Sequence, residues 1–310
     1  MDRPELELRI ISCIASATEI VHALGLGRYL VGRSHECDWP PAVRDLPICT
    51  RPRFDIYGDS QQIDQRVRDS LRDAGSVYEV LTEVVDSLAP THILTQTQCK
   101  VCAVSLEDVE DSLKLSFQSR PQIVALEPNS LLGIWQDIQR VAVGCGTLDS
   151  GEILIQQLHQ VINQTATFAD TSTTRPTVAC IEWPKPIMAA GNWIPELIQL
   201  ANGTSLLGKA GSYSPTIEFT DLEQANPEVI VIMPCGYDLK KSREEARWLT
   251  ELPGWSKLQA VQNDRVYITD ANQYMTRPGP RIVESLQALT QMLHPQLFPP
   301  TLENIAWQKL

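Results

Sequence analysis

The sequence predicts an α/β protein of two lobes, each with a mainly parallel sheet, joined by a long backbone helix. Its 310 residues exceed one ordinary core and suit two domains of about 100–150 residues each. Strand-like and helical patterns alternate in both halves, which is typical of parallel sheets. A long helical pattern lies between them. We therefore expect an N-terminal lobe over residues 1–128, an inter-lobe helix over 129–166 and a C-terminal lobe over 167–310.

The first half carries four strand patterns and four helical patterns. The strand patterns are short, apolar and followed by a turn or a helix start, and they are Arg9–Ile14, Tyr29–Gly32, His92–Thr95 and Gln122–Leu126. The helical patterns are Glu19–Leu24, Gln62–Ala74, Tyr78–Leu88 and Ser105–Gln118. The last two have acidic residues in or near their first turn, which the helix dipole favours.

The helical pattern in the middle of the chain runs from about Ser130 to Thr165. Its apolar residues recur mostly at three- and four-residue spacing, but Gly144, Gly146 and Gly151 interrupt it. It is therefore either one kinked helix or two in succession. The second half then alternates the strands Thr177–Glu182, Val229–Met233 and Arg265–Ile268 with the helices Trp193–Ala201, Asp221–Ala225, Lys241–Leu249 and Arg281–Leu293.

Charge and composition narrow the class of partner. The net charge is −12, from 26 Lys and Arg against 38 Asp and Glu, with no basic run, so we expect no nucleic-acid binding. The sequence contains no run of about 18 apolar residues, so we expect no insertion into a membrane. The opening segment MDRPELEL lacks the apolar core of an export signal, and the eight scattered cysteines fit a reducing compartment. The expected location is therefore the cytoplasm.

Two polar segments follow the first two strands. Ser16 and Thr18 lie in a turn that opens a helix, where they either cap the helix or line a crevice at the carboxyl end of the sheet. The loop HECDWP then places His35, Cys37 and Trp39 after the second strand. A neutral His35 imidazole could coordinate cobalt or another transition metal, and Trp39 could stack on a flat macrocycle. The plainer alternative is that His35 only makes hydrogen bonds.

A C-x-x-C motif lies where the third strand meets a helix. Gln96 ends that strand, and Cys99 and Cys102 follow before a helix that begins near Ser105. This placement suits a redox dithiol, and it also supplies half of a metal site that His35 and Cys37 could complete. Two ordinary cysteines at a helix start are the remaining alternative.

Aromatic and polar residues gather at strand ends and helix starts of the second half. Trp183 ends a strand, and Asn192 and Trp193 precede a helix. The two tryptophan rings either line the binding site of a planar ligand or pack in the core. Tyr213 and Tyr274 occupy similar positions. Arg277 precedes the last long helix, where it either is structural or binds an anionic group of the ligand.

The chain has no recognised catalytic motif. It contains no G-x-S-x-G elbow, no phosphate-binding loop, no H-E-x-x-H and no G-x-G-x-x-G after a strand. This absence makes an enzyme the weaker interpretation without excluding one.

Together, SATEIVHALGLG and HECDWP resemble the start of the cobalamin-binding members of the solute-binding proteins that serve bacterial metal-chelate importers, and NPEVIVIMPCG resembles a strand common to many binding proteins. The resemblance covers about residues 9–295. It implies two Rossmann-like lobes bridged by a long helix, with the ligand held in a cleft between them. It also implies docking on a transporter through one acidic residue of each lobe. In the second lobe, residues 218–223 contain acidic residues, but their sequence does not identify which one would dock. Docking on a permease is therefore doubtful.

These observations predict a binding protein for a corrinoid, cobalamin-like or similar metal-chelate ligand, working inside the cell. The alternatives are a thiol- or metal-dependent enzyme that uses Cys99 and Cys102, the binding protein of an ABC importer, and an assembly or regulatory factor with a vestigial cleft. The ligand-binding residues that we expect are Ser16, Thr18, His35, Trp39, Gln96, Trp183, Asn192, Trp193, Tyr213, Tyr274 and Arg277.

Overall fold

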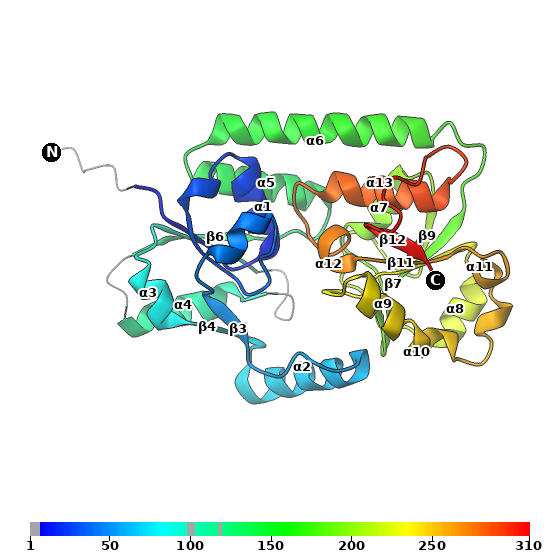
Figure 1. Cartoon of the computed structure of the whole chain (residues 1–310), viewed down its shortest axis with the longest axis horizontal. Coiled ribbons are helices and arrows are strands. Elements are labelled where there is room, and N and C mark those ends of the chain that lie inside the picture. Colours follow the sequence, from blue (N-terminus) through cyan, green and yellow to red (C-terminus); the bar gives the residue numbers. More distant parts are fainter. Residues whose placement is uncertain (1–6, 98–102, 117–119) are drawn as a thin grey trace. The chain divides into compact units, whose positions relative to one another are not determined.

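The computed structural model describes residues 7–97, 103–116 and 120–310, which fall into two compact units (Figure 1). Unit 1 comprises the chain up to Tyr57 together with Gln65–Pro128 and Leu132–Gln156. Unit 2 comprises Gly58–Asp64, Asn129–Leu131 and Gln157–Leu310. Both units contain a sheet with helices around it, so the predicted α/β class with parallel sheets and a long helix is confirmed.

Unit 1 is built on a four-stranded parallel sheet in the order β2-β1-β5-β6. The buried residues Ile10 and Ile11 of β1 lie at its centre. The strands of this sheet match the four predicted from the sequence, with shifted ends: β1 (Ile10–Ser12), β2 (Leu30–Arg33), β5 (His92–Gln96) and β6 (Gln122–Leu126). The helices that accompany them are α1 (Ala15–Ala23), α2 (Ser60–Ala74), α3 (Thr82–Ser87), α4 (Leu106–Ser116) and α5 (Leu131–Gly144).

The predicted helix Tyr78–Leu88 is wrong in its first part. Tyr78–Val80 forms strand β4, which pairs antiparallel with β3 (Thr50–Pro52), and helix α3 begins only at Thr82. Tyr78 and Val80 are both buried while Glu79 between them is half-buried, which is the alternation of a strand. The acidic residues Glu79 and Glu83 imitate a helix start, and the tertiary pairing with β3 overrides that local signal.

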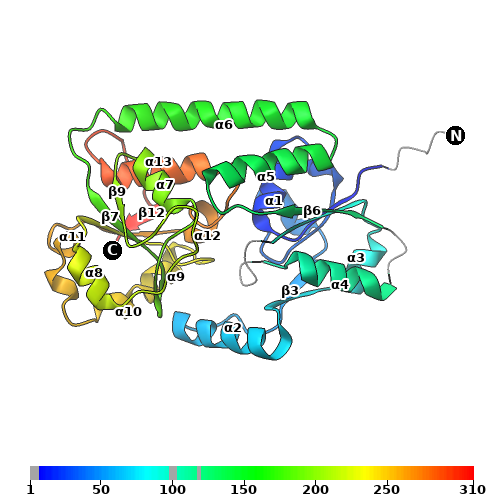
Figure 2. The same ribbon diagram turned by 180° about the vertical axis from the view of Figure 1, so that it is seen from behind.

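The long helical pattern in mid-chain is two helices in succession. Helix α5 ends at Gly144, and α6 (Leu148–Ala169) is the long helix in green in Figure 1, with α5 beside it in the view from behind in Figure 2. Gly146 between them has φ +71°, a left-handed conformation that suits glycine and ends a helix. The boundaries predicted for the two lobes and the inter-lobe helix stay a prediction.

Unit 2 is built on a mixed six-stranded sheet in the order β12-β11-β10-β7-β8, with β9 also paired to β7. Strands β7, β9, β10 and β11 are parallel, whereas β8 and β12 run antiparallel at the edges. The bounds of these strands are β7 (Thr177–Pro184), β8 (Ile187–Ala189), β9 (Thr204–Leu206), β10 (Val229–Ile232), β11 (Val266–Thr269) and β12 (Trp307–Lys309). The sequence patterns predicted β7, β10 and β11 but missed the three short strands.

Helices lie on both faces of the unit 2 sheet (Figures 1 and 2). Ile230 and Ile232 of β10 pack in one cluster with Leu222 and Leu249, and alternation sends Val229 and Val231 to the other face. The helices of this unit are α7 (Ile194–Leu200), α8 (Phe219–Ala225), α9 (Leu239–Glu245), α10 (Arg247–Thr250), α11 (Gln259–Gln262), α12 (Ala271–Tyr274) and α13 (Ile282–Leu293). The single helix predicted for Lys241–Leu249 is therefore α9 and α10 in succession.

Two glycines of one unit 2 loop give a test of this packing. A Cβ added at Gly208 would overlap the backbone carbonyl of Ala190, whereas one at Gly211 would meet open space but needs a left-handed φ of +70°. We expect Gly208→Ala to cost about 3 kcal/mol of unfolding free energy through overpacking, and Gly211→Ala only about 1 kcal/mol. Urea unfolding followed by circular dichroism measures both. Equal costs for the two variants would contradict the close approach of Gly208 to Ala190.

Candidate functional site

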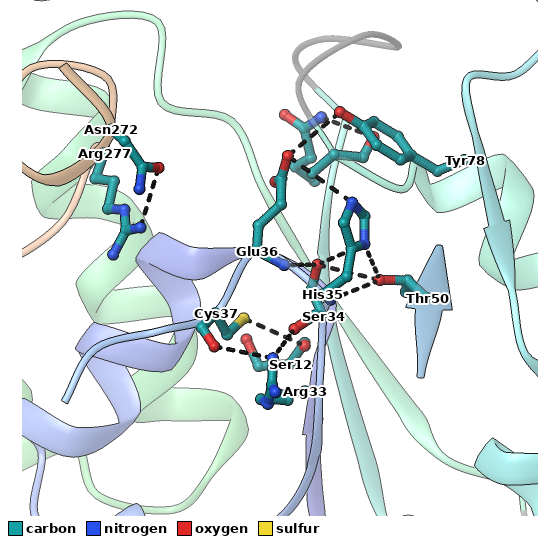
Figure 3. Close-up of polar contacts among 12 residues, drawn as sticks. Ser12, Arg33, Ser34, His35, Glu36, Cys37, Thr50, Tyr78, Asn272 and Arg277 are labelled. Carbon is teal, nitrogen blue, oxygen red and sulfur yellow. Dashed lines mark hydrogen bonds and ion pairs between the residues drawn. The ribbon is translucent and has the colours of Figure 1, made fainter. Parts of the chain in front are cut away.

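Arg33 organises the loop that leaves the carboxyl end of β2. Its side chain is buried and donates hydrogen bonds to the backbone carbonyls of Ser34 and Cys37, each at 3.1 Å (Figure 3). It also donates to the backbone carbonyl of Arg44 at 3.0 Å. A guanidinium has five donors in a fixed plane, so it suits several carbonyls at once. The HECDWP loop is thereby held at the carboxyl edge of the unit 1 sheet.

His35 lies in this loop and is held by Thr50 at the start of β3. The His35 backbone N–H donates to Thr50 Oγ1 at 3.2 Å, and His35 Nδ1 lies 2.8 Å from the same oxygen (Figure 3). Thr50 Oγ1 in turn donates to Ser34 Oγ at 3.1 Å. Because the threonine proton points to Ser34, Thr50 accepts from His35 Nδ1–H. This hydrogen-bond pattern assigns the proton to Nδ1 and a lone pair to Nε2.

The surroundings keep the His35 imidazole neutral near pH 7. Burial lowers the pKa of His35 to about 4, with Arg33 adding to the effect and a hydrogen bond at Thr50 opposing it. The side chain is still 19% exposed, and Nε2 lies 4.0 Å from Glu36 Oε1. The Tyr78 ring lies 5.3 Å from the His35 ring, and its hydroxyl donates to Glu36 Oε1 at 3.4 Å. A neutral imidazole, a carboxylate and a phenol thus share one corner of unit 1.

Ser16 and Thr18 do not cap helix α1. The helix begins at Ala15 with Ile14 as its N-cap, so both residues lie inside it, and both are buried. Thr18 Oγ1 contacts Cys37 Sγ at 3.0 Å. The sequence signal placed the helix start too late because Ser and Thr favour cap positions. Their predicted part in ligand binding stays a prediction.

Burial makes four of the described cysteines poor nucleophiles, because it raises the pKa of the Cys13, Cys49, Cys145 and Cys180 thiols. Burial raises the pKa of Cys13 well above its usual value and that of Cys49 to about 12. Since the thiolate is the nucleophile, these side chains do not support thiol chemistry. The predicted dithiol Cys99 and Cys102 lies outside the described residues.

The predicted metal site is not assembled by the residues that the structure describes. Among them, no three His, Cys, Asp or Glu side chains come together as metal ligands. His35 is directed to Thr50, whereas Cys37 Sγ is directed to Thr18 and to the Ser12 carbonyl at 3.9 Å. The part of this prediction that rests on Cys99 and Cys102 stays untested.

Trp39 and Gln96 complete the predicted set in unit 1. Trp39 is 42% exposed, so its ring offers an apolar face at the surface of the unit. Gln96 ends β5 and is buried, and its amide donates to the Ala103 carbonyl at 3.3 Å. The ring of Trp39 is therefore the more accessible of the two groups.

Three aromatic residues follow three adjacent parallel strands of unit 2. Trp183 lies at the end of β7, Tyr237 follows β10, and Tyr274 follows β11 in helix α12. The rings of Trp183 and Tyr237 are 5.2 Å apart. The backbone N–H of Asn272 donates to the Tyr237 carbonyl at 3.2 Å and joins two of these segments. The carboxyl edge of the unit 2 sheet therefore carries a row of rings, which we call the aromatic edge.

The first turn of α2 packs beside this aromatic edge. The Ser60 backbone N–H donates to Glu245 Oε2 at 2.7 Å, and the Ser60 carbonyl accepts from Trp183 Nε1 at 3.2 Å. Glu245 also pairs with Lys241 at 2.9 Å. A carboxylate at a helix N-terminus is favoured by the helix dipole. Glu245 thus holds the start of α2, and Trp183 is fixed by the same turn.

The remaining unit 2 residues differ in exposure. Tyr213 is 65% exposed, and Asn192 is half-buried with a left-handed φ of +51°. Trp193 is buried, and its indole N–H donates to the Met275 carbonyl at 3.2 Å. This burial favours core packing for Trp193, whose role in ligand binding stays a prediction.

The two arginines near α13 make side-chain contacts within unit 2. Arg277 is buried, and its Nη2 donates to Asn272 Oδ1 at 3.1 Å (Figure 3). Arg281 pairs with Glu284 at 3.0 Å, and its guanidinium lies 4.7 Å from the centre of the Tyr274 ring. These contacts support the structural interpretation of Arg277 and give Arg281 a structural role as well.

Sequence reasoning did not place the residues that organise the unit 1 site. Arg33, Thr50 and Tyr78 carry no motif, and Tyr78 was assigned to a helix. Recognising the β3–β4 pair would have brought Thr50 and Tyr78 to one sheet. The signal available for that pair was the Tyr78–Val80 alternation.

Comparison with known proteins identifies the family. The family model described as periplasmic binding protein matches residues 10–273. This chain belongs to the periplasmic binding protein family. The predicted membership of the solute-binding protein family is therefore confirmed, and the chain is a solute-binding protein in fold and family.

Named relatives cover nearly the whole chain. An uncharacterized ABC transporter substrate-binding lipoprotein of Bacillus subtilis is 22% identical over 295 residues, which is 94% of this chain and 81% of the relative. The vitamin B12-binding protein of Vibrio cholerae is 22% identical over 286 residues, which is 92% of this chain and 88% of the relative.

Solved structures share the fold at low identity. A periplasmic heme-binding protein from Roseiflexus sp. RS-1 has a TM-score of 0.69 at 22% identity and covers 94% of this chain and 99% of its own. The periplasmic vitamin B12-binding protein of Vibrio cholerae has a TM-score of 0.65 at 20% identity, and the match covers 92% of this chain and 96% of that structure.

Among the described residues of this binding protein, no helix has both the length and the apolarity needed to span a membrane.

The neutral state of His35 gives a pH-dependent stability. The pKa of His35 is about 4 in the folded protein against 6.5 when unperturbed, so the unfolded state binds the proton first as the pH falls. The contribution is fully present above pH 6.5 and is lost towards pH 4. When the pH is lowered from 7.5 to 5, the unfolding free energy of the wild type should fall by about 2 kcal/mol more than that of the His35→Phe variant.

Urea titrations at the two pH values measure this difference. His159→Phe, at an exposed position of α6, is the matched control and should keep the wild-type pH dependence. An identical loss in the wild type and in His35→Phe would show that His35 is not held neutral.

Proposed function

We propose that this protein binds a corrinoid, a cobalamin-like metal chelate, as a reversible carrier. The aromatic edge of unit 2 carries the proposal, because Trp183, Tyr237 and Tyr274 follow three adjacent parallel strands. Ligands of open α/β sheets bind at such edges, and rings supply apolar area with a fixed face. The vitamin B12-binding and heme-binding relatives support a metal chelate as the class of ligand.

The charge of the chain favours a corrinoid over heme. Heme carries two anionic propionates, whereas the side chains of a corrinoid are mostly neutral amides around a cationic cobalt centre. The chain has a net charge of −12, which disfavours an anionic ligand. The arginines that could pair with propionates, Arg277 and Arg281, bond Asn272 and Glu284 within unit 2.

The described residues also fit a ligand carrier better than a thiol enzyme. Burial raises the pKa of the Cys49 and Cys180 thiols to about 12. An enzyme that uses Cys99 and Cys102 is the competing proposal, and it requires activity that disappears in the Cys99→Ser/Cys102→Ser variant. Corrinoid affinity unchanged in that variant, with no thiol-dependent turnover, supports the carrier.

Titration with cyanocobalamin, aquocobinamide and hemin, followed by absorbance, tests the ligand. We expect corrinoids to bind at micromolar concentrations or below and hemin to bind more weakly. Trp183→Leu should weaken aquocobinamide binding roughly tenfold, as for the loss of a ring contact of about 1.4 kcal/mol.

Phe168→Leu is the matched control for this variant, because Phe168 is 48% exposed at the end of α6 and packs on Phe298. It should bind as the wild type does. No spectral change with either corrinoid at micromolar concentrations would overturn the proposal, and preferential binding of hemin would reassign the ligand.

We further propose that the protein acts in the cytoplasm and does not dock on an ABC permease. The scattered thiols motivate this proposal, and the lipoprotein relative of Bacillus subtilis favours the importer alternative. Fractionation of the native organism, with detection of the untagged protein by antibody, separates the two. Recovery with the membrane or the periplasm, or co-purification with a permease, would establish the importer function instead.

A further inference from the structure

We propose that the Glu182 carboxylate determines which chelate is bound, by accepting a hydrogen bond from one propionamide arm of a corrinoid and rejecting a carboxylate in its place. This inference rests on the proposed function and adds the chemistry that the site selects. It concerns unit 2 alone, where Glu182 directly precedes Trp183 of the aromatic edge.

A β-bulge sets Glu182 apart from the rest of β7. Ile181 of β7 pairs with Ala189 of β8. Trp183 pairs with Met188, so two steps along β7 match one step along β8. Glu182 is therefore the extra residue of the bulge. Bulges leave the extra residue out of regular pairing and redirect its side chain, and they recur beside functional sites.

Ser214 holds one oxygen of this carboxylate. The Ser214 hydroxyl donates to Glu182 Oε2 at 2.5 Å and accepts from the Gly191 backbone N–H at 3.0 Å. The short distance to Oε2 is typical of a hydroxyl bonded to an ionised carboxylate. The segment that follows Ser214 pairs with β8, where the Ile217 N–H donates to the Ile187 carbonyl at 2.9 Å. The sheet therefore fixes the serine, and the serine fixes the carboxylate.

The other oxygen, Glu182 Oε1, is left for a ligand. Within the described ranges only Ser214 bonds the carboxylate, and no lysine or arginine there pairs with it. Burial raises the pKa of the Glu182 carboxyl, and the Ser214 bond opposes this effect. The side chain is half-buried, so a donor can still reach it. A carboxylate that is short of water and has no counter-ion gains from an added N–H donor and repels a second carboxylate.

The neighbours of this carboxylate suit the rim of a large planar ligand. The Glu182 carbonyl accepts from the Cys235 backbone N–H at 3.2 Å, in the loop that carries Tyr237. Ser214 follows Tyr213, whose side chain is 65% exposed. Rings for the face of a macrocycle and an acceptor for its edge thus belong to adjoining residues. A corrin bears acetamide and propionamide arms around its edge, and the longer propionamide suits an acceptor set back from the surface.

Equilibrium dialysis with cyanocobalamin and its three monocarboxylic acids tests this contact. Each acid carries a propionate in place of one propionamide, so it differs from cyanocobalamin at a single group. At pH 7.5 we expect at least one acid to bind the wild type at least about tenfold more weakly, because its propionate meets the Glu182 carboxylate. Binding of all three acids within about twofold of cyanocobalamin would overturn the inference.

Glu182→Gln assigns the preference to one residue. A glutamine amide can donate to a propionate, so the disfavoured acid should bind this variant within about threefold of cyanocobalamin. Glu228→Gln is the matched control, because Glu228 is also half-buried and accepts from a hydroxyl, that of Thr177 at 3.2 Å, but at the opposite end of β7. This control should keep the wild-type preference. A preference that survives in Glu182→Gln would show that another group selects the amide.

The outcomes separate this inference from the proposed function. Cyanocobalamin that binds without discrimination against any of the acids overturns the Glu182 contact and leaves corrinoid binding intact. No binding of cyanocobalamin or aquocobinamide overturns both. Should Glu182→Gln fail to fold by circular dichroism, Ser214→Ala replaces it, because it releases the carboxylate to water and should reduce the preference. An unchanged preference in that variant overturns the inference.

Discussion

The candidate site in unit 1 depends on one buried charge, the Arg33 guanidinium. Its hydrogen bonds run to the carbonyls of residues 34, 37 and 44, so a single side chain replaces the secondary structure that the loop lacks. Buried polar backbone groups without partners would each cost on the order of 1–3 kcal/mol. With those carbonyls paired, the loop can present His35 and Glu36 in fixed positions beside Thr50 and Tyr78 rather than collapse onto the sheet.

A second constraint is the parallel arrangement of most strands in both sheets. Parallel strands bring their ends to one edge, so residues far apart in sequence become neighbours without any direct pairing signal. In unit 2 this brings the Trp183 ring beside the Tyr237 ring, which lies 54 residues further along the chain. In unit 1 the segment before Thr50 pairs with Arg33 at the end of β2, through the Arg33 N–H to the Pro47 carbonyl and the Cys49 N–H to the Arg33 carbonyl. This pairing brings Thr50 of the separate β3–β4 pair beside His35.

The sequence was most informative where a local pattern determines the outcome. The strands of the unit 1 sheet and the central strands of unit 2 are continuous apolar runs, and those were predicted. Residues 78–80 were misassigned because pairing with β3 decides their conformation, and a single sequence does not show that partner. Thr50 and Arg33 were missed for the same reason, since their contacts depend on where the loop folds back and not on any motif. His35 and Trp183 were found because both follow recognisable strands.

The ionisable groups of unit 1 favour the proposed reversible binding over covalent chemistry. The thiols of Cys13 and Cys49 are buried and held protonated, so they cannot attack a substrate at neutral pH. The His35 imidazole is also held neutral, but its side chain reaches the surface and its Nε2 keeps a lone pair. Burial therefore has opposite consequences for the two kinds of group, because it favours the neutral form of each. The neutral thiol is inert, whereas the neutral imidazole keeps a lone pair that can take part in reversible contacts.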